Sequence, residues 1–498
     1  MVPLVRWRID SVVQTDAQRV GYTSPLQAPG ATATPGLALH RAALPVQRPP
    51  ATQNPMNRAH PTRSIARRTS CPVWYALLTG ALVLAALSTA LPTHAQELPS
   101  AEPEEVGMSS ERLLRLTHAL QAYVDEGRLP GVVAMVLRNG RVVYHEAVGN
   151  RDIEAGAPMH PDAIFRIASQ TKALVSVAIM MLQEDGALLI SDRVSTHLPS
   201  FSATTVAEPM DDGYEIVPAR RPITIRDLLT HTAGIGYGYG PGADAWREAE
   251  ITGWYFAHRD EPVRETIDRL AGLPFQAQPG ARFVYGYNTD ILGAVVEAAS
   301  GMSLDAFLQE RILDPLDMRD THFYLPGEKE ARLATVYNLA DGLRRAPSGP
   351  GMQTQGQYVE GPRVSFSGGA GLLSTARDYG RFLQMLLDGG ELEGVRLLSP
   401  SSVALMTQNH IGDLYAAPGM GFGLGFSVRL DVGAAGAPGS TGEFGWGGAY
   451  HSTYWVDPVE DLVVLYFTQV IPATGLDDHA RLRALVYSSI MESAAMMR

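Results

Sequence analysis

Strand-forming runs lie near both ends of the folded part of this chain, and a helix-rich stretch separates them. Two β-branched-rich runs, Val132–Leu137 and Val142–His145, flank Asn139-Gly140, which is typical of a type I′ hairpin. Because isolated hairpins are barely stable, we expect them to pair with the late strands. The fold class is therefore α/β of the α+β type: an antiparallel sheet flanked by helices, with a mostly helical subdomain inserted at about 190–345. The late runs are Phe422–Leu430, Ala449–Val456 and Leu462–Thr468, the last two joined by Asp457–Asp461.

Helical patterns cover the segments between and after these strands. In one of them, Thr375 and Asp378 resemble a capping box, and Gly389 stands where a helix commonly ends. Its apolar stripe predicts a plain core helix. The predicted helices are Ser110–Glu126, Ser169–Glu184, Thr375–Asp388 and His479–Met496.

The first 95 residues differ from the rest. Residues 1–55 show no hydrophobic period and are interpreted as disordered or as an over-extended start. Residues 56–95 combine several arginines, the apolar run Val73–Leu91 and a small-residue cleavage pattern ending at Ala95, which predicts a signal peptide. An uncleaved membrane anchor is the alternative. Either reading predicts a periplasmic or secreted protein that meets a membrane only through this segment, with residues 96–498 forming one domain.

Composition excludes several function classes. The chain of 498 residues carries a formal charge of -12, although residues 1–95 are basic, so nucleic acid is not an expected partner. Cys71 is the single cysteine, and the 13 histidines lack metal-ligand spacing, so we predict no metal and no cofactor. The glycine-rich Gly234–Gly240 does not match a nucleotide-binding pattern and is interpreted as a mobile loop. Oligomeric state is not determined by these features.

Ser169 and Lys172 are the strongest candidates for chemistry. The chain has only two lysines, Lys172 and Lys329, and one of them lies three residues after a serine at a helix start. That spacing places both side chains on one helix face. A lysine buried beside apolar residues loses its proton more easily and can act as a base for the serine hydroxyl. An ordinary helix start is the alternative interpretation.

The stretch Ile167–Lys172, followed by an apolar helix, resembles the serine β-lactamase and penicillin-binding-protein superfamily. The resemblance is closest to the class C β-lactamase-like branch that includes family VIII carboxylesterases, and it spans about 105–495. It implies a β-lactamase/transpeptidase-like fold and acyl-enzyme chemistry at Ser169. Supporting stretches are Ile225–Gly234, Asp314–Met318 and Gly368–Thr375.

The resemblance also implies a catalytic tyrosine. Phe283–Gly293 matches the family's second motif, and the spacing to Leu292-Gly293 assigns the role to Tyr285. Tyr287 occupies the place of the usual lactamase asparagine, which weakens a lactam-specific reading. Tyr287 is therefore a candidate substrate-binding residue and the alternative for the tyrosine role, while aromatic packing remains open for both tyrosines.

The third motif is Trp446-Gly447-Gly448-Ala449, where lactamases carry Lys-Thr-Gly. The resemblance implies that Trp446, Gly447 and Gly448 border the substrate and that the Ala449 N–H joins the Ser169 N–H in an oxyanion hole. A tight strand entry with a packing tryptophan is the alternative. His451 follows the motif and either lines the site or is a strand-surface histidine, whereas His231 is expected to be a structural hydrogen-bonding residue.

These features favour a serine hydrolase that forms an acyl-enzyme, most simply a carboxylesterase on short- to medium-chain esters. Its partner is a small-molecule ester or lactam substrate. The aromatic residues of 236–256 form either an apolar substrate pocket or subdomain core. A β-lactamase, a D-amino-acid peptidase or an acyltransferase would use the same residues. A penicillin-binding sensor with slow turnover and an anchored structural protein are the alternatives of other classes.

Overall fold

The strand β1 (Gly131–Arg138) is buried along its whole length, because helices cover both faces of its sheet. The computed structural model describes residues 98–494, which belong to one compact unit. A two-residue turn joins β1 to β2 (Arg141–Asp152). Both turn residues have positive φ, 51° at Asn139 and 70° at Gly140, which confirms the predicted type I′ geometry.

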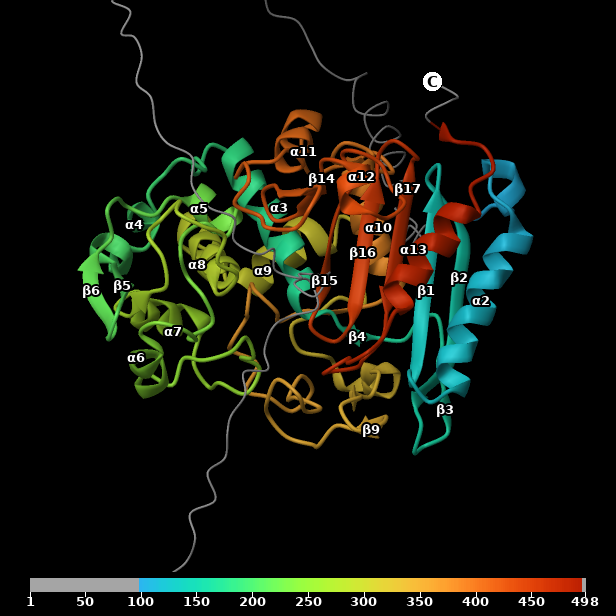
Figure 1. Cartoon of the computed structure of the whole chain (residues 1–498), viewed down its shortest axis with the longest axis horizontal. Coiled ribbons are helices and arrows are strands. Elements are labelled where there is room, and N and C mark those ends of the chain that lie inside the picture. Colours follow the sequence, from blue (N-terminus) through green and yellow to red (C-terminus); the bar gives the residue numbers. More distant parts are fainter. Residues whose placement is uncertain (1–97, 495–498) are drawn as a thin grey trace, which may run out of the picture. The chain divides into compact units, whose positions relative to one another are not determined.

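The main sheet has eight strands in the order β13-β14-β15-β16-β17-β1-β2-β3, and neighbouring strands run antiparallel. The early hairpin joins the late strands where β1 pairs with β17, with Val133 opposite Phe467. In Figure 1 the cyan β1 lies beside the red β17. This confirms the predicted antiparallel sheet built from distant segments. The remaining strands are β3 (Ala157–Pro158), β13 (Met420–Phe422), β14 (Ser427–Arg429), β15 (Phe444–Gly448), β16 (Ser452–Asp457) and β17 (Leu462–Phe467).

Alternation along β1 divides the core into two layers. Val132, Ala134 and Val136 join a cluster with α2 (Ser110–Asp125) and α13 (Asp478–Ser488). Their neighbours in sequence point to the other face and join the larger cluster, which contains α3 (Thr171–Glu184) and α10 (Ala376–Leu387). Since successive side chains of a strand point to opposite faces, a run that is apolar at every position fits a sheet covered on both sides.

Three predicted boundaries are wrong. The run Phe422–Leu430 is two short strands, because Gly425 has φ 95° and turns the chain between them. The strand predicted from Ala449 begins at Ser452, after a turn closed by a bond from the His451 N–H to the Gly448 carbonyl. The last helix ends at Ser488, and Ile490 then bridges to Met108.

The middle of the chain contains more helices than strands, and it also holds a small sheet. Strands β5 (Thr205–Met210) and β6 (Gly213–Pro218) form a hairpin, and β7 (Pro274–Phe275) pairs parallel with β5. The helices are α4 (Val194–His197), α5 (Ile225–Leu229), α6 (Ala243–Glu248), α7 (Val263–Leu270), α8 (Asn288–Ser300) and α9 (Leu304–Leu308), with a π-helical turn at Gln309–Leu313.

Shorter elements complete the fold. The short strand pairs are β4 (Phe165–Arg166) with β10 (Leu373–Ser374), β8 (Tyr337–Asn338) with β9 (Arg344–Arg345), and β11 (Glu391–Leu392) with β12 (Val395–Arg396). The other helices are α11 (Pro400–Met406), α12 (Val432–Ala435) and the 3-10 turns Pro103–Val106, Ala168–Gln170, Pro199–Ala203 and Gly327–Arg332.

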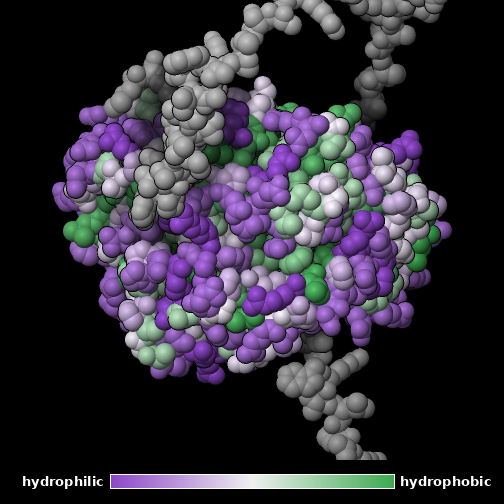
Figure 2. Space-filling model, turned by 180° about the vertical axis from the view of Figure 1, so that it is seen from behind, coloured by the Kyte–Doolittle hydropathy of each residue, from purple (hydrophilic) through white to green (hydrophobic). Residues whose placement is uncertain are grey.

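Hydrophilic residues dominate the face seen in Figure 2, with hydrophobic residues in smaller groups between them. Large apolar side chains exposed at the surface belong to separate elements, such as Leu114 on α2, Met210 on β5 and Leu405 on α11. Within residues 98–494, no single helix is long and apolar enough to cross a membrane; one sharply bent pair, Asn288–Ser300 with Leu304–Leu313, passes on length and composition. The predicted signal segment lies outside the described residues and stays a prediction.

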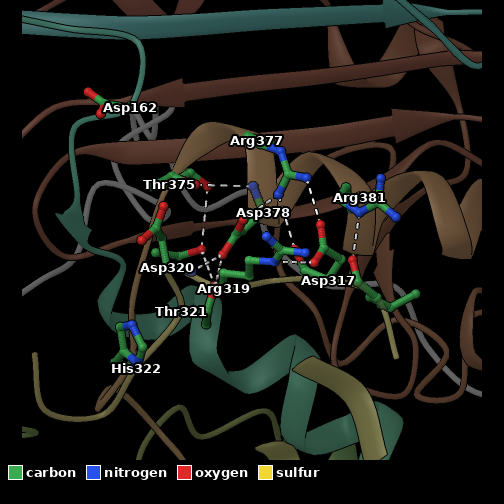
Figure 3. A network of polar contacts seen from close by, with 12 residues as sticks. Asp162, Asp317, Arg319, Asp320, Thr321, His322, Thr375, Arg377, Asp378 and Arg381 are labelled. Carbon is green, nitrogen blue, oxygen red and sulfur yellow. Dashed lines mark hydrogen bonds and ion pairs between the residues drawn. The ribbon is translucent and has the colours of Figure 1, made fainter. Parts of the chain in front are cut away.

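The start of α10 differs from the predicted capping box. The Thr375 hydroxyl accepts a hydrogen bond from the Asp378 N–H at 3.2 Å, which confirms Thr375 as the N-cap. In the described part of the chain, the Asp378 carboxylate accepts instead from the Asp320 N–H and the Thr321 hydroxyl, at 2.7 and 3.0 Å (Figure 3). The Asp378 side chain therefore holds the loop at Asp320 and Thr321 and does not cap α10.

Replacing Thr375 by alanine leaves the Asp378 N–H at the buried start of α10 without its acceptor. We expect the free energy of unfolding to fall by about 1 kcal/mol. Urea denaturation followed by circular dichroism measures this change. The control Thr375→Ser retains the oxygen and should stay close to the unaltered protein; equal stability of the alanine and serine variants would contradict the cap.

Candidate active site

Ser169 lies at the junction between a strand and a helix. The chain leaves β4, forms the 3-10 turn Ala168–Gln170 and continues directly into α3. Ala168 has a φ of 43°, a left-handed conformation that a non-glycine residue rarely adopts. A hydrogen bond of 2.8 Å from the Tyr379 hydroxyl to the Gln170 carbonyl holds the turn. Ser169 remains half-buried, whereas Ala168 and Gln170 are buried.

Lys172 is only 2% exposed and reaches back to Ser169, as the spacing predicted. Its Nζ donates to the Ser169 Oγ at 3.3 Å, to the Tyr237 hydroxyl at 3.2 Å and to the Gly369 carbonyl at 2.6 Å. All three acceptors are uncharged groups. A serine hydroxyl and a buried amine within hydrogen-bonding distance form the nucleophile and base arrangement of serine hydrolases that lack histidine.

Tyr285 lies on the other side of the lysine. The Lys172 Nζ is 4.7 Å from the centre of the Tyr285 ring, a distance at which a cation is attracted to the ring face. The Trp446 indole N–H donates to the Tyr285 hydroxyl at 3.0 Å. The structure therefore brings together Ser169, Lys172, Tyr285 and Trp446, all of which the sequence nominated.

Tyr287 has a different environment. It is 1% exposed and stacks on Trp246, with ring centres 5.9 Å apart and an interplanar angle of 3°. The Tyr237 and Phe256 rings pack edge-on against it. Burial raises the pKa of its phenol. These contacts favour the packing alternative for Tyr287 and favour Tyr285 for the tyrosine role.

Strand β15 approaches the Ser169 turn at backbone distance. A Cβ on Gly448 would lie 2.5 Å from the Ile167 carbonyl oxygen, so the strand could not come this close with a larger residue. Among the turn, loop and cap hydrogen bonds of residues 98–494, neither the Ser169 N–H nor the Ala449 N–H donates to a backbone carbonyl. Gly447, Gly448 and Ala449 are half-buried, as is Ser169. This geometry is compatible with the predicted oxyanion hole.

His231 packs against Tyr285 and is hydrogen-bonded to Asn288. It is buried, its ring centre lies 4.7 Å from that of Tyr285, and its Nδ1 lies 2.9 Å from the Asn288 side-chain amide. Burial and the nearby Lys172 charge lower its pKa well below the usual value, which keeps the ring neutral. Because the amide donates to Nδ1, we assign the His231 proton to Nε2. His231 thus has the hydrogen-bonding role that the sequence predicted.

His451 faces away toward α13. It is buried in the turn between β15 and β16, so the strand-surface alternative is wrong. Its Nε2 lies 2.8 Å from the Asp478 carboxylate, and the His479 ring stacks on it with centres 4.0 Å apart. These two histidines and Asp478 are the one group of three in residues 98–494 with ligand atoms close enough to share a cation. The planes of the two histidine rings differ by 11°.

The sequence missed three contributors to the lysine's surroundings. Tyr237, placed beforehand only among aromatic pocket or core residues, accepts a hydrogen bond from Lys172. Residues 234–238 are buried against the site, unlike an exposed loop. Gly369 and Asp290 complete the surroundings, since the Gly369 N–H donates to Asp290 at 3.0 Å. The density of glycine and tyrosine in 234–240 was the one available signal.

Comparison with known proteins agrees with this architecture. The Beta-lactamase family profile matches residues 116–488. Protein Rv1367c of Mycobacterium tuberculosis is 37% identical over 381 residues, which cover 72% of this chain and 90% of that protein. Esterase EstB of Burkholderia gladioli is 34% identical, covering 71% and 89% respectively. The solved structure of EstCE1, described as a hydrolase with promiscuous acyltransferase activity, has a TM-score of 0.66 and 30% identity, covering 76% of this chain and 98% of that one.

The chain therefore belongs to the Beta-lactamase family. Its relatives and its fold define a serine hydrolase-type enzyme with an antiparallel sheet and flanking helices, in a family that includes esterases and acyltransferases.

Replacing Gly448 by alanine tests the close approach of β15 to the Ser169 turn. The added methyl would meet the Ile167 backbone, and overpacking of this kind lowers the free energy of unfolding by about 1–3 kcal/mol. We therefore expect the thermal midpoint to fall by several degrees. Differential scanning calorimetry measures the shift. Gly327→Ala is the matched control, because a Cβ there meets nothing within 4 Å. Equal midpoints for the two variants would show that the strand is not held as described.

Proposed function

We propose that this protein is a carboxylesterase that forms an acyl-enzyme through Ser169 and acts on short- to medium-chain esters. The observation that supports it is the Lys172 Nζ within 3.3 Å of the Ser169 Oγ, buried among uncharged acceptors. The family profile and the esterase relatives support the same reaction class.

In the proposed reaction, neutral Lys172 accepts the Ser169 hydroxyl proton while the Oγ forms a bond to the ester carbonyl carbon. The Ser169 and Ala449 N–H groups donate to the oxyanion. The tetrahedral intermediate then breaks its bond to the alcohol oxygen, which takes a proton from Tyr285, and Tyr285 regains one from the Lys172 ammonium. Water attacks the acyl carbon next, the carboxylic acid leaves, and the Ser169 hydroxyl is restored.

Trp446 supports an ester rather than a β-lactam substrate. The resemblance to lactamases places a lysine there that helps hold the lactam carboxylate, and an indole carries no charge. In this chain the indole N–H is already bonded to the Tyr285 hydroxyl. Trp446 also packs against Phe422, with ring centres 5.3 Å apart, which adds apolar surface beside the half-buried nucleophile. Apolar acyl groups suit such a surface better than a carboxylate does.

Acyl transfer to an alcohol is a second candidate activity. The same acyl-enzyme would serve it, with an alcohol oxygen replacing water as the attacking group. The observation that favours it is the 30% identity and shared fold with EstCE1, a hydrolase described as having promiscuous acyltransferase activity. Formation of butyl butyrate from vinyl butyrate and butanol, followed by gas chromatography, tests it; hydrolysis alone would exclude it.

Substitution of Ser169 and Lys172 tests the nucleophile and the base. We expect Ser169→Ala to reduce kcat/KM on p-nitrophenyl butyrate by about a thousandfold or more. Lys172→Arg should lose a comparable factor, because arginine keeps the charge but cannot be deprotonated. Initial rates with a chromogenic cephalosporin, measured in parallel, report how far lactams are accepted. Full ester turnover in Ser169→Ala would overturn the proposed function.

The two tyrosines can be separated by removing one hydroxyl at a time. Tyr285→Phe removes the group that returns the proton to the leaving alcohol, so kcat should fall about 100-fold. Tyr287→Phe keeps the stacked ring and should change kcat by no more than about threefold. Steady-state kinetics on ethyl butyrate, whose alcohol needs a proton to leave, decides between them when the released acid is followed by pH-stat titration. The reverse pattern would transfer the role to Tyr287.

A further inference from the structure

Asp290 is a buried carboxyl that the ester mechanism does not use. It lies in the first turn of α8 and is 1% exposed. Its Oδ1 accepts from the Ser367 hydroxyl at 2.6 Å and from the Gly369 N–H at 3.0 Å. Its Oδ2 has no hydrogen-bond partner within residues 98–494. A carboxylate so placed is costly unless an opposite charge lies nearby.

That opposite charge belongs to Lys172. Gly369 contacts both groups: its N–H donates to Asp290, and its carbonyl accepts from the Lys172 Nζ at 2.6 Å. A Cβ on Gly369 would lie 2.3 Å from the Asp290 Oδ2, so only glycine allows this approach. Burial raises the pKa of Asp290, and the Lys172 charge opposes that rise. The two buried groups are therefore coupled across one residue.

The other titratable side chains around Lys172 and Asp290 are tyrosines and a histidine. They are Tyr237 from the loop after α5, Tyr285 and Tyr287 before α8, and His231 after α5. Burial raises the pKa of Tyr237 well above its usual value, and burial lowers that of His231. Asp290 is thus the acidic group among those that face Lys172 from the packed elements.

We propose that Asp290 is a positioning residue for Lys172: held by Ser367 and Gly369, its carboxylate fixes the Gly369 carbonyl against the lysine and balances the ammonium charge. The inference rests on the proposed function, in which Lys172 is the base. In the proposed reaction Lys172 must be neutral to accept the Ser169 proton, and a nearby carboxylate stabilises an ammonium relative to a neutral amine. Asp290 therefore sets the pH above which the enzyme is active.

The isosteric variant Asp290→Asn tests this. Asparagine retains an acceptor for Ser367 and Gly369 but removes the charge, so the acidic limb of kcat/KM against pH should move by about one unit or more to lower pH. Ser367→Ala is the matched control, since it removes a hydrogen bond and keeps the charge; its limb should coincide with that of the unaltered enzyme. An Asp290→Asn limb at the unaltered pH, with only a lower plateau, would reduce Asp290 to a structural role.

A second measurement uses the unaltered protein and covers the case in which Asp290→Asn does not fold. Because the chain contains only Lys172 and Lys329, lysine labelled with carbon-13 at Cε gives two NMR signals, and Lys329→Arg assigns them. The Lys172 signal should show a second inflection, from Asp290, below its own titration. A single inflection contradicts the coupling. Dependence of ester turnover on Ser169 and Lys172 is a separate result, so failure here leaves the proposed function standing.

Discussion

The antiparallel pairing of β1 with β17 is the contact on which the rest of the structure depends. It joins a hairpin near the start of the described chain to strands near its end, with Val133 opposite Phe467. Both faces of this pair are buried, one against α2 and α13, the other against α3 and α10. Such long-range pairing carries a large loop-closure cost, which the apolar burial on both faces offsets.

The site depends on that sheet because two of its parts come from segments that are far apart in the chain. Ser169 lies in the 3-10 turn before α3 and Lys172 in the first turn of α3, whereas Trp446 and Ala449 lie at the end of β15 and in the turn after it. Glycine at 448 lets the two backbones approach. The hydrogen bond from Trp446 to Tyr285 then connects the sheet to the helical region at α8. The register of the sheet therefore determines where Trp446 and Ala449 lie relative to Ser169.

Local pattern predicted the elements better than their ends. The hairpin at Asn139-Gly140 was predictable because its turn type requires those residues. The last helix was predicted too long because pairing of Ile490 with Met108, far away in sequence, draws the chain out of it. The hairpin β5–β6 was missed, since each of its strands contains a proline, which weakens a strand pattern. In the site, Tyr237 lies in no recognised motif, and Asp290 lies within Phe283–Gly293, where the resemblance pointed to the tyrosines alone.

By itself, the sequence determined the fold class, the Ser169–Lys172 pair, whose spacing of three residues is a property of helix geometry, and the family. The motif spacing pointed to Tyr285, but only the tertiary structure decided what surrounds the two tyrosines: the Tyr285 ring lies against Lys172, and Tyr287 stacks on Trp246. It also decided that His451 faces α13 and that Gly369 bonds to both the buried Asp290 carboxyl and Lys172. Such contacts join segments far apart in the chain, and local patterns carry no information on which distant side chains will meet.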